Sequence, residues 1–153
     1  MLTRPISTTV ALLALTTALA ACGSNKDGSG GGAVQLDGKS PARVQMQDIK
    51  FDVTSFSVVA GTTVQFDFTN AGKVPHDAFI GDAAAQADHE TEMAAMASNG
   101  DMAHHSMDES AITVQPGASG TLTYTFTTPG TYEIGCHQPG HYAAGMKATI
   151  TVS

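Results

Sequence analysis

The chain has 153 residues, of which 14 are acidic and 7 are basic, and its formal net charge is −7 at pH 7. This acidic balance argues against nucleic acid and anionic lipid as partners. It is compatible with a redox or other protein partner that carries a basic docking patch. The length allows one folded domain.

Residues 1–21 have the features of an export signal. Arg4 precedes a mostly apolar run over 10–21, which is too short to span a bilayer. The run ends in Leu19-Ala-Ala-Cys22, which resembles the bacterial lipoprotein box. That resemblance implies cleavage before Cys22 and lipidation of Cys22, so the chain would be anchored to an extracytoplasmic membrane face, in the periplasm or at the cell surface. The alternative is an ordinary signal peptide that is cleaved nearby, with Cys22 incidental.

Residues 22–40 follow as a stretch that is rich in glycine and serine and begins at the lipidated cysteine. Such a composition is too poor in apolar residues to fold, and it predicts a flexible tether. The folded domain is then expected over residues 41–153.

Alternation of apolar and polar residues with a period of two predicts strands through this domain. In the clearest case, Val64, Phe66 and Phe68 alternate with Gln65 and Asp67. Turns that contain glycine and proline separate the segments. In chain order, the predicted strands are Arg43–Ile49, Phe56–Val59, Val64–Phe68, Ala111–Val114, Leu122–Phe126, Tyr132–Cys136 and Met146–Val152. Their number and spacing predict an all-β fold, an antiparallel β-sandwich.

One insertion, over residues 82–110, interrupts the pattern of strands. Its first part, Asp82 to Ser98, is rich in alanine and lacks glycine and proline, which predicts a helix. Its second part is polar, rich in methionine and histidine, and expected to be mobile. The insertion lies between a strand that follows His76 and the strand at 111–114.

The insertion has two interpretations. His89, Met93 and Met96 share one face of the predicted helix, and they could pack against the sandwich. Alternatively, they could form a second, soft copper site, because thioethers and imidazoles select Cu(I). The further residues that such a site could use are Met102, His104, His105 and Met107.

Near the C-terminus, Cys136, His141 and Met146 follow one another at intervals of five residues. A thiolate, an imidazole and a thioether form a soft ligand set that favours copper over zinc, calcium or magnesium. A distant histidine, His76, would complete a trigonal site of two histidines and one cysteine with a weak axial methionine. If Cys22 is lipidated, Cys136 has no disulfide partner, and metal ligation would explain a lone thiol outside the cytoplasm. The alternative is a buried free cysteine.

The segments Asn70…Pro75-His76-Asp77 and Tyr132-x-Ile-x-Cys136-x4-His141-x4-Met146 resemble the cupredoxins, the plastocyanin and azurin class. The resemblance covers roughly residues 43–153. The spacing of the late loop is similar to that of auracyanin and rusticyanin, and the loop also resembles that of periplasmic cupredoxins associated with copper resistance. It implies a Greek-key sandwich and one type 1 copper ion, Cu(II)/Cu(I), that transfers single electrons to a redox protein. The implied ligands are His76, Cys136, His141 and Met146.

Three residues near these ligands need separate comment. Asp77 stands where plastocyanins carry asparagine, and Gly135 precedes the cysteine where a hydroxyl residue could tie two loops together. His137 is expected to be an exposed loop residue and not a ligand. The chain has six histidines in all, too few for the additional copper centres of oxidases and reductases, so we expect that it is not an enzyme.

The expected function is one-electron transfer by a mononuclear type 1 copper outside the cytoplasm. An uncharged rim around His141 would let its exposed imidazole edge serve as the electron exit; the rim residues are Pro139, Gly140, Tyr142, Ala143, Ala144 and Gly145. The alternative is a copper-binding protein for tolerance or delivery. A third hypothesis is a copper-free sandwich that binds a protein partner. It predicts that Cys136→Ala changes neither the visible colour nor the metal binding of the protein.

Overall fold

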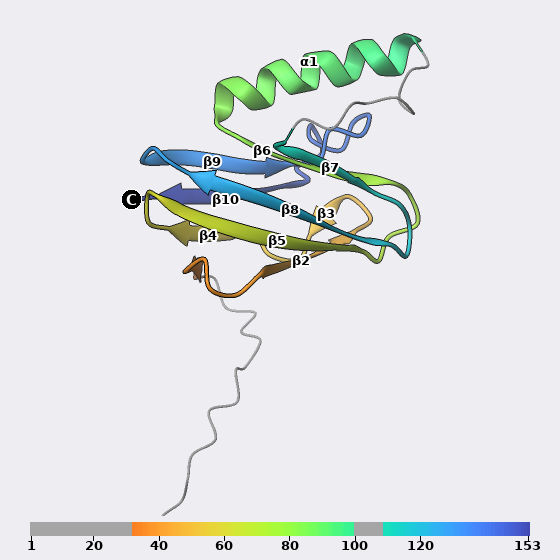
Figure 1. Ribbon diagram of the computed structural model, residues 1–153. Helices are drawn as coiled ribbons and strands as arrows, with labels where there is room; N and C mark the ends of the chain where they lie inside the picture. The colour runs from red at the N-terminus through yellow and green to blue at the C-terminus, as the bar shows by residue number, and fades with distance from the viewer. Residues whose placement is uncertain (1–31, 100–108) are drawn as a thin grey trace, which may run out of the picture. The chain divides into compact units, whose positions relative to one another are not determined.

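The computed structural model describes residues 32–99 and 109–153. The predictions for residues 1–31, which include the signal and the lipidation site at Cys22, therefore lie outside the described residues. The same holds for four members of the predicted second copper site, Met102, His104, His105 and Met107. The described part contains ten strands and one helix (Figure 1). These are β1 Val34–Leu36, β2 Ala42–Gln47, β3 Lys50–Phe51, β4 Ser55–Val58, β5 Thr62–Asn70, β6 His76–Gly81, α1 Ala83–Asn99, β7 Ala111–Val114, β8 Ser119–Phe126, β9 Gly130–Gly135 and β10 Lys147–Val152.

The strands form two sheets that enclose a common apolar core, so the predicted β-sandwich is confirmed. The six-stranded sheet has the order β1-β4-β10-β9-β6-β7, and the four-stranded sheet has the order β3-β2-β5-β8. The alternation that predicted β5 is visible in its burial, since Val64, Phe66 and Phe68 are all fully buried. The ring of Phe66 lies 6.0 Å from that of Phe56 and 6.4 Å from that of Phe126, so residues of both sheets meet there.

The sheets are mixed, which corrects the prediction of a wholly antiparallel sandwich. Three described pairs are parallel: β1 with β4, β10 with β4, and β2 with β5. Between β2 and β5 the chain visits the other sheet as β4 and then returns. A strand that returns after such a crossing is not joined to its neighbour by a hairpin, so nothing forces the pair to be antiparallel.

The sandwich also begins earlier than predicted. Residues 34–36, which were assigned to the flexible tether over 22–40, form β1 and pair with β4. Leu36 is buried in the core. Because β1 has only three residues and follows a glycine-rich stretch, it is too short to give a periodic signal in the sequence.

Strand β6 is buried along its whole length. Its neighbours β9 and β7 flank it within the sheet, and α1 lies across it (Figure 1). A strand with both faces covered shows no alternation of apolar and polar residues. This is the strand that places the first predicted copper ligand, His76.

The helix predicted over 82–98 is confirmed as α1, Ala83–Asn99. Asp82 caps its N-terminus, since Oδ1 of Asp82 accepts a hydrogen bond of 2.9 Å from the Ala85 amide. The buried side chains of α1 are Gln86, His89 and Met93. No helix among residues 32–99 and 109–153 has the length and apolar character that a membrane span requires.

Replacement of Phe66 by alanine tests the core that joins the two sheets. Phe66→Ala is expected to lower the free energy of unfolding by about 3–5 kcal/mol, because it removes a fully buried ring and leaves a cavity. Gln65→Ala, on the exposed side of the same strand, should change that free energy by no more than about 0.5 kcal/mol. Urea unfolding of the copper-free protein, followed by circular dichroism, measures both. Equal effects of the two substitutions would contradict the assigned core.

Candidate metal centre

The predicted ligands converge because β6 and β9 are antiparallel neighbours. Phe79 of β6 pairs with Gly135 of β9. His76 opens β6, and Cys136 directly follows β9, so the two residues meet at one end of the sandwich although they are 60 positions apart. The loop between β9 and β10 returns over the same end and carries His141 and Met146.

Three of the predicted ligand atoms already face one another. Sγ of Cys136 lies 3.7 Å from Nδ1 of His76 and 3.4 Å from Nδ1 of His141. Metal bonds of about 2.0 Å to nitrogen and 2.3 Å to sulfur, in a trigonal arrangement, would separate nitrogen from sulfur by about 3.7 Å. The three residues also form a group whose ligand atoms all lie within 4.8 Å of one another. This spacing fits one metal ion held by two imidazoles and a thiolate.

Met146 is held beside these three ligands by its backbone. Its amide donates a hydrogen bond of 3.0 Å to the His141 carbonyl, and its carbonyl accepts one of 3.1 Å from the Cys136 amide. Its side chain is fully buried, where a thioether can act as a weak fourth donor. Gly140 and Gly145 supply the bends of the loop, with φ angles of 82° and 93°.

The loop that precedes His76 is fixed by Asn70, whose role was not predicted. Nδ2 of this buried residue donates hydrogen bonds of 2.8 Å to the carbonyls of Val74 and Val114. Its Oδ1 accepts another of 2.8 Å from the Gly72 amide. Asn70 therefore holds the turn between β5 and β6, and so the approach to His76. An asparagine shortly before a Pro-His pair is the signal that could have indicated it.

Asp77 of β6 links the strand that carries His76 to the loop that follows Cys136. Its Oδ1 accepts a hydrogen bond of 3.1 Å from the Gln138 amide and lies 3.0 Å from Sγ of Cys136. Asp77 is buried, so this link is shielded from water. The carboxyl of Asp77 thus connects the strand of the first histidine to the loop after the cysteine.

The surroundings of His76 and Cys136 favour the uncharged forms of these two ligands. Burial lowers the pKa of His76, and the nearby His141 lowers it further, so His76 is neutral at pH 7. Burial raises the pKa of the Cys136 thiol well above its ordinary value, and the Asp77 carboxyl raises it further. Of the three, His141 alone is partly exposed. A bound cation would supply the charge that stabilises the thiolate.

The expectation that His137 is an exposed loop residue was wrong. It is only 2% exposed. Its Nε2 lies 2.7 Å from Oε1 of Gln86, and its Nδ1 contacts Oε2 of Glu90. Both partners belong to α1, so the helix covers His137. Gln86 and Glu90 are 51 and 47 residues away from His137 in the sequence, and no sequence pattern indicated that they are in contact.

The structure supports packing for the residues of the predicted second copper site that it describes. His89 and Met93 are 4% and 3% exposed. The His89 ring stacks on Phe79 with centroids 4.1 Å apart and an interplanar angle of 11°. Met96 is partly buried on the same helix. Within the described ranges, the one group of histidine, cysteine or acidic side chains with metal-binding spacing is that of His76, Cys136 and His141.

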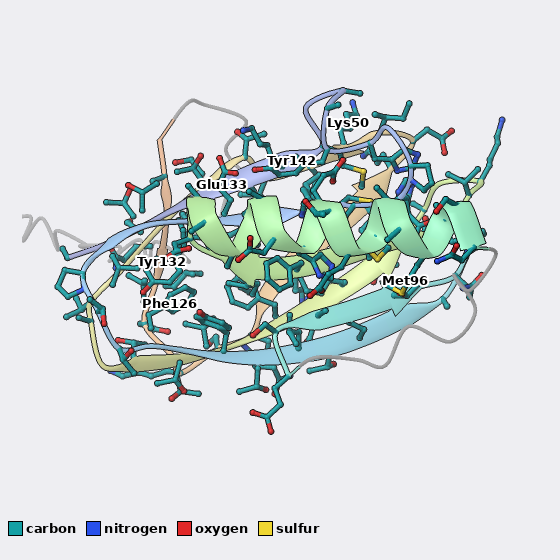
Figure 2. The ribbon with its side chains drawn as sticks, turned by 90° about the horizontal axis from the view of Figure 1, so that it is seen from above. Lys50, Met96, Phe126, Tyr132, Glu133 and Tyr142 are labelled. Atoms are coloured by element: carbon teal, nitrogen blue, oxygen red, sulfur yellow. The ribbon has the colours of Figure 1, made fainter. Side chains whose placement is uncertain are left out.

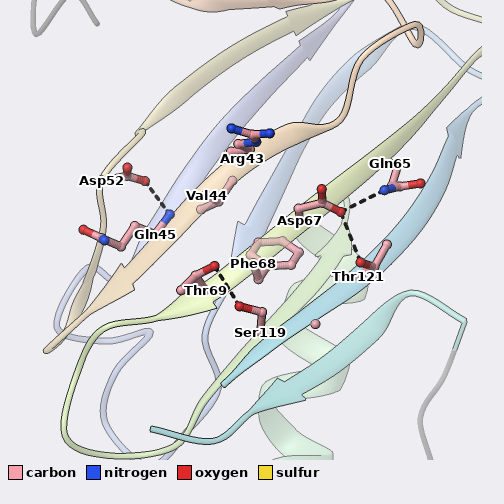
Figure 3. Close-up of a pocket in the computed structure, with 11 residues that line it drawn as sticks. Arg43, Val44, Gln45, Asp52, Gln65, Asp67, Phe68, Thr69, Ser119 and Thr121 are labelled. Atoms are coloured by element: carbon pink, nitrogen blue, oxygen red, sulfur yellow. Dashed lines mark hydrogen bonds between the residues drawn. The ribbon is translucent and has the colours of Figure 1, made fainter. Parts of the chain in front are cut away.

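A hollow of about 620 Å³ lies on the four-stranded sheet and contains none of the copper ligands (Figure 3). Five of its polar side chains bond to one another. Asp67 accepts hydrogen bonds from Gln65 at 2.8 Å and from Thr121 at 3.1 Å, and the hydroxyls of Thr69 and Ser119 lie 3.0 Å apart. This is the pattern of a solvated sheet face with cross-strand pairs.

Comparison with known proteins agrees with this geometry. Residues 39–153 match the family described as "Copper binding proteins, plastocyanin/azurin family". The copper-resistant cuproprotein CopI of Rubrivivax gelatinosus is 35% identical, over 97% of this chain and 96% of the relative. CopI of Pseudomonas aeruginosa is also 35% identical, over 71% of this chain and 74% of the relative. The crystal structure of reduced auracyanin from Roseiflexus castenholzii superposes with a TM-score of 0.62 at 28% identity, over 80% of this chain and 99% of that one.

The fold and the site define a cupredoxin-type copper protein. The chain belongs to the plastocyanin/azurin family of copper-binding proteins. Its type 1 copper site consists of His76, Cys136, His141 and Met146. Membership of this family of small cuproproteins supports the prediction that the chain is not an enzyme.

The protonation of Cys136 gives a direct test of the site. Binding of Cu(II) at pH 7 is expected to release about one proton per chain, because the buried thiol must become a thiolate while His76 is already neutral. Calorimetric titration in two buffers of different ionisation enthalpy measures this number. Met146→Leu should release the same number, because a thioether has no proton to lose. Copper binding without proton release would contradict ligation by Cys136.

Proposed function

We propose that this protein transfers single electrons outside the cytoplasm through its type 1 copper. Bound copper would supply the redox chemistry by cycling between Cu(II) and Cu(I). The observation that carries the proposal is the convergence of the ligand set, in which Cys136 Sγ lies 3.7 and 3.4 Å from two imidazole nitrogens. A site that needs little rearrangement between oxidation states suits fast electron transfer.

Hydrogen bonds on both sides of the site support this rigidity. Asn70 holds the loop before His76, and Asp77 ties that strand to the Gln138 amide. Backbone hydrogen bonds connect Met146 to both Cys136 and His141. The ligands thus sit on segments that are fixed independently of the metal, which is the arrangement expected for preorganised metal ligands.

His141 is the proposed electron exit. His141 is partly exposed, whereas His76 and Cys136 are buried. The loop that carries it is otherwise uncharged between Pro139 and Met146. Pro139, Gly140 and residues 143–145 around it are exposed. Such a small uncharged rim suits a transient docking interface. The net charge of −7 favours a partner with a basic docking patch.

A second candidate function is copper binding for tolerance or delivery. It is favoured by the likeness to a copper-resistant cuproprotein over almost the whole of both chains. In that role the same four ligands would hold copper as cargo or during its detoxification. The copper site is common to both candidate functions. They differ in whether the protein passes on an electron and keeps its copper, or holds copper for detoxification or delivery.

The electron-transfer proposal predicts fast, salt-dependent exchange with a basic partner. The copper-loaded, reduced protein should reduce a cationic c-type cytochrome, at a rate that falls about tenfold from low to high ionic strength. Stopped-flow absorbance measures the rate. Cys136→Ala should lose both the visible thiolate-to-copper absorption and the transfer. Met146→Leu keeps the three strong ligands and should retain the colour with a shifted reduction potential.

The opposite outcome would favour the second candidate. In that case the reduced protein would exchange electrons slowly with every basic partner tried. Copper would instead pass from the protein to a metal-free acceptor, and cells that carry Cys136→Ala would lose copper tolerance.

We also propose that lipid chains on Cys22 anchor the protein to an extracytoplasmic membrane face. The motif of residues 19–22 supports this location, and an extracytoplasmic site is in keeping with the family. Cys22→Ala is expected to move the protein from the membrane fraction to the soluble fraction, because the acyl chains provide the attachment. Fractionation followed by immunoblotting measures this. Cys136→Ala is the matched control and should remain with the membranes.

A further inference from the structure

The helix α1 contacts the copper loop at the residue that directly follows the copper thiol. His137 lies between Cys136 and the rest of the loop, and two side chains of α1 contact its ring nitrogens. Oε1 of Gln86 lies 2.7 Å from Nε2 of His137, and Oε2 of Glu90 contacts Nδ1. Figure 2 looks down on α1 and shows Glu133 and Tyr142 along one flank of the helix.

The Gln86 amide has a fixed orientation. Its Nε2 donates a hydrogen bond of 2.8 Å to the Glu133 carbonyl of β9. The same nitrogen lies 3.3 Å and 3.4 Å from the carbonyls of Phe79 and Gly81 on β6. Carbonyl oxygens only accept, so Oε1 is left to face His137, and His137 must donate through its Nε2–H. One buried amide therefore joins α1, β6, β9 and the copper loop.

Gly135 provides the space for this contact. A Cβ at residue 135 would lie 2.5 Å from Oε1 of Gln86 and 2.9 Å from Nε2 of His137. Any larger residue would displace the hydrogen bond between them. Residue 135 therefore offers no hydroxyl that could connect two loops. The hydrogen bond between His137 and Gln86 connects the copper loop to α1 instead.

The His137 ring is also held from its faces. Tyr142 stacks on it with centroids 4.5 Å apart and an interplanar angle of 22°, and the His89 ring meets it edge to face at 4.9 Å. The Tyr142 hydroxyl donates a hydrogen bond of 2.5 Å to Oε2 of Glu133. The ring of His137 is therefore fixed in position and in orientation, although it is not a copper ligand.

From these contacts we infer that Gln86 and Glu90 of α1 are positioning residues for the copper thiolate. They act through His137, whose backbone follows Cys136 directly and sets the direction in which Sγ points between the two imidazoles. The inference depends on the copper site alone. It holds for either candidate function, so its failure would leave both of them standing.

The test compares two substitutions on α1 in the full copper-loaded protein. Gln86→Met keeps the length of the side chain but removes every hydrogen bond of the amide. It is expected to shift the thiolate-to-copper absorption and the Cu(II) hyperfine splitting, and to weaken Cu(I) affinity about tenfold in competition with a chelator such as bathocuproine disulfonate. Asp88→Ala, at an exposed position of the same helix, should change none of these quantities.

Two results decide the outcome. If Gln86→Met lowers thermal stability while the absorption, the hyperfine splitting and the affinity stay at their original values, α1 is only a cover and the inference is overturned. If Gln86→Met does not fold, His137→Phe serves in its place, because it keeps an aromatic ring against Tyr142 and His89 and removes the polar contacts to Gln86 and Glu90 of α1. The same spectral shift and loss of affinity are expected for His137→Phe, and unchanged values would overturn the inference.

Discussion

The antiparallel pairing of β6 with β9 is the constraint on which the copper site depends. Through the register of Phe79 with Gly135, it brings the start of one strand and the end of the other to the same edge of the sandwich. His76 and Cys136 are thereby adjacent, and the hydrogen bond from the Gln138 amide to Asp77 joins the segments that carry them. Backbone hydrogen bonds of Met146 to Cys136 and His141 then close the late loop over them. The metal site is a consequence of sheet topology, and the loop between β9 and β10 adds the remaining donors, His141 and Met146.

Burial determines the chemistry of this site. The buried thiol of Cys136 and the buried imidazole of His76 favour their neutral forms, and burial moves the pKa of each in the direction that this requires. Metal binding therefore has to supply the charge that makes the thiolate stable. The preformed geometry also limits the rearrangement that accompanies a change of oxidation state. These two properties suit a soft metal such as copper that remains in place while its charge changes.

The insertion that carries α1 has two structural effects on the same region. It covers the outer face of β6, which is why that strand is buried throughout. It also supplies the polar side chains Gln86 and Glu90, which hold His137 beside the thiolate. The buried face of α1 thus contains an amide and an imidazole as well as Met93, and the partly exposed carboxyl of Glu90 lies beside it. The Gln86 amide is tolerated there because its hydrogen bonds are satisfied by the loop and the strands, and the His89 ring stacks on Phe79 of β6.

The sequence alone determined the copper ligands and the sandwich. Cys136, His141 and Met146 are closely spaced on one loop, so their spacing can be read from the sequence, and alternation marks the longer strands that have one exposed face, such as β5. Tertiary structure decided the remainder. The parallel pairs and β1 depend on which sheet the chain enters next, and the burial of His137 depends on where α1 docks. Neither leaves a local pattern, because contacts between residues distant in sequence are fixed by packing and not by the periodicity of the segments themselves.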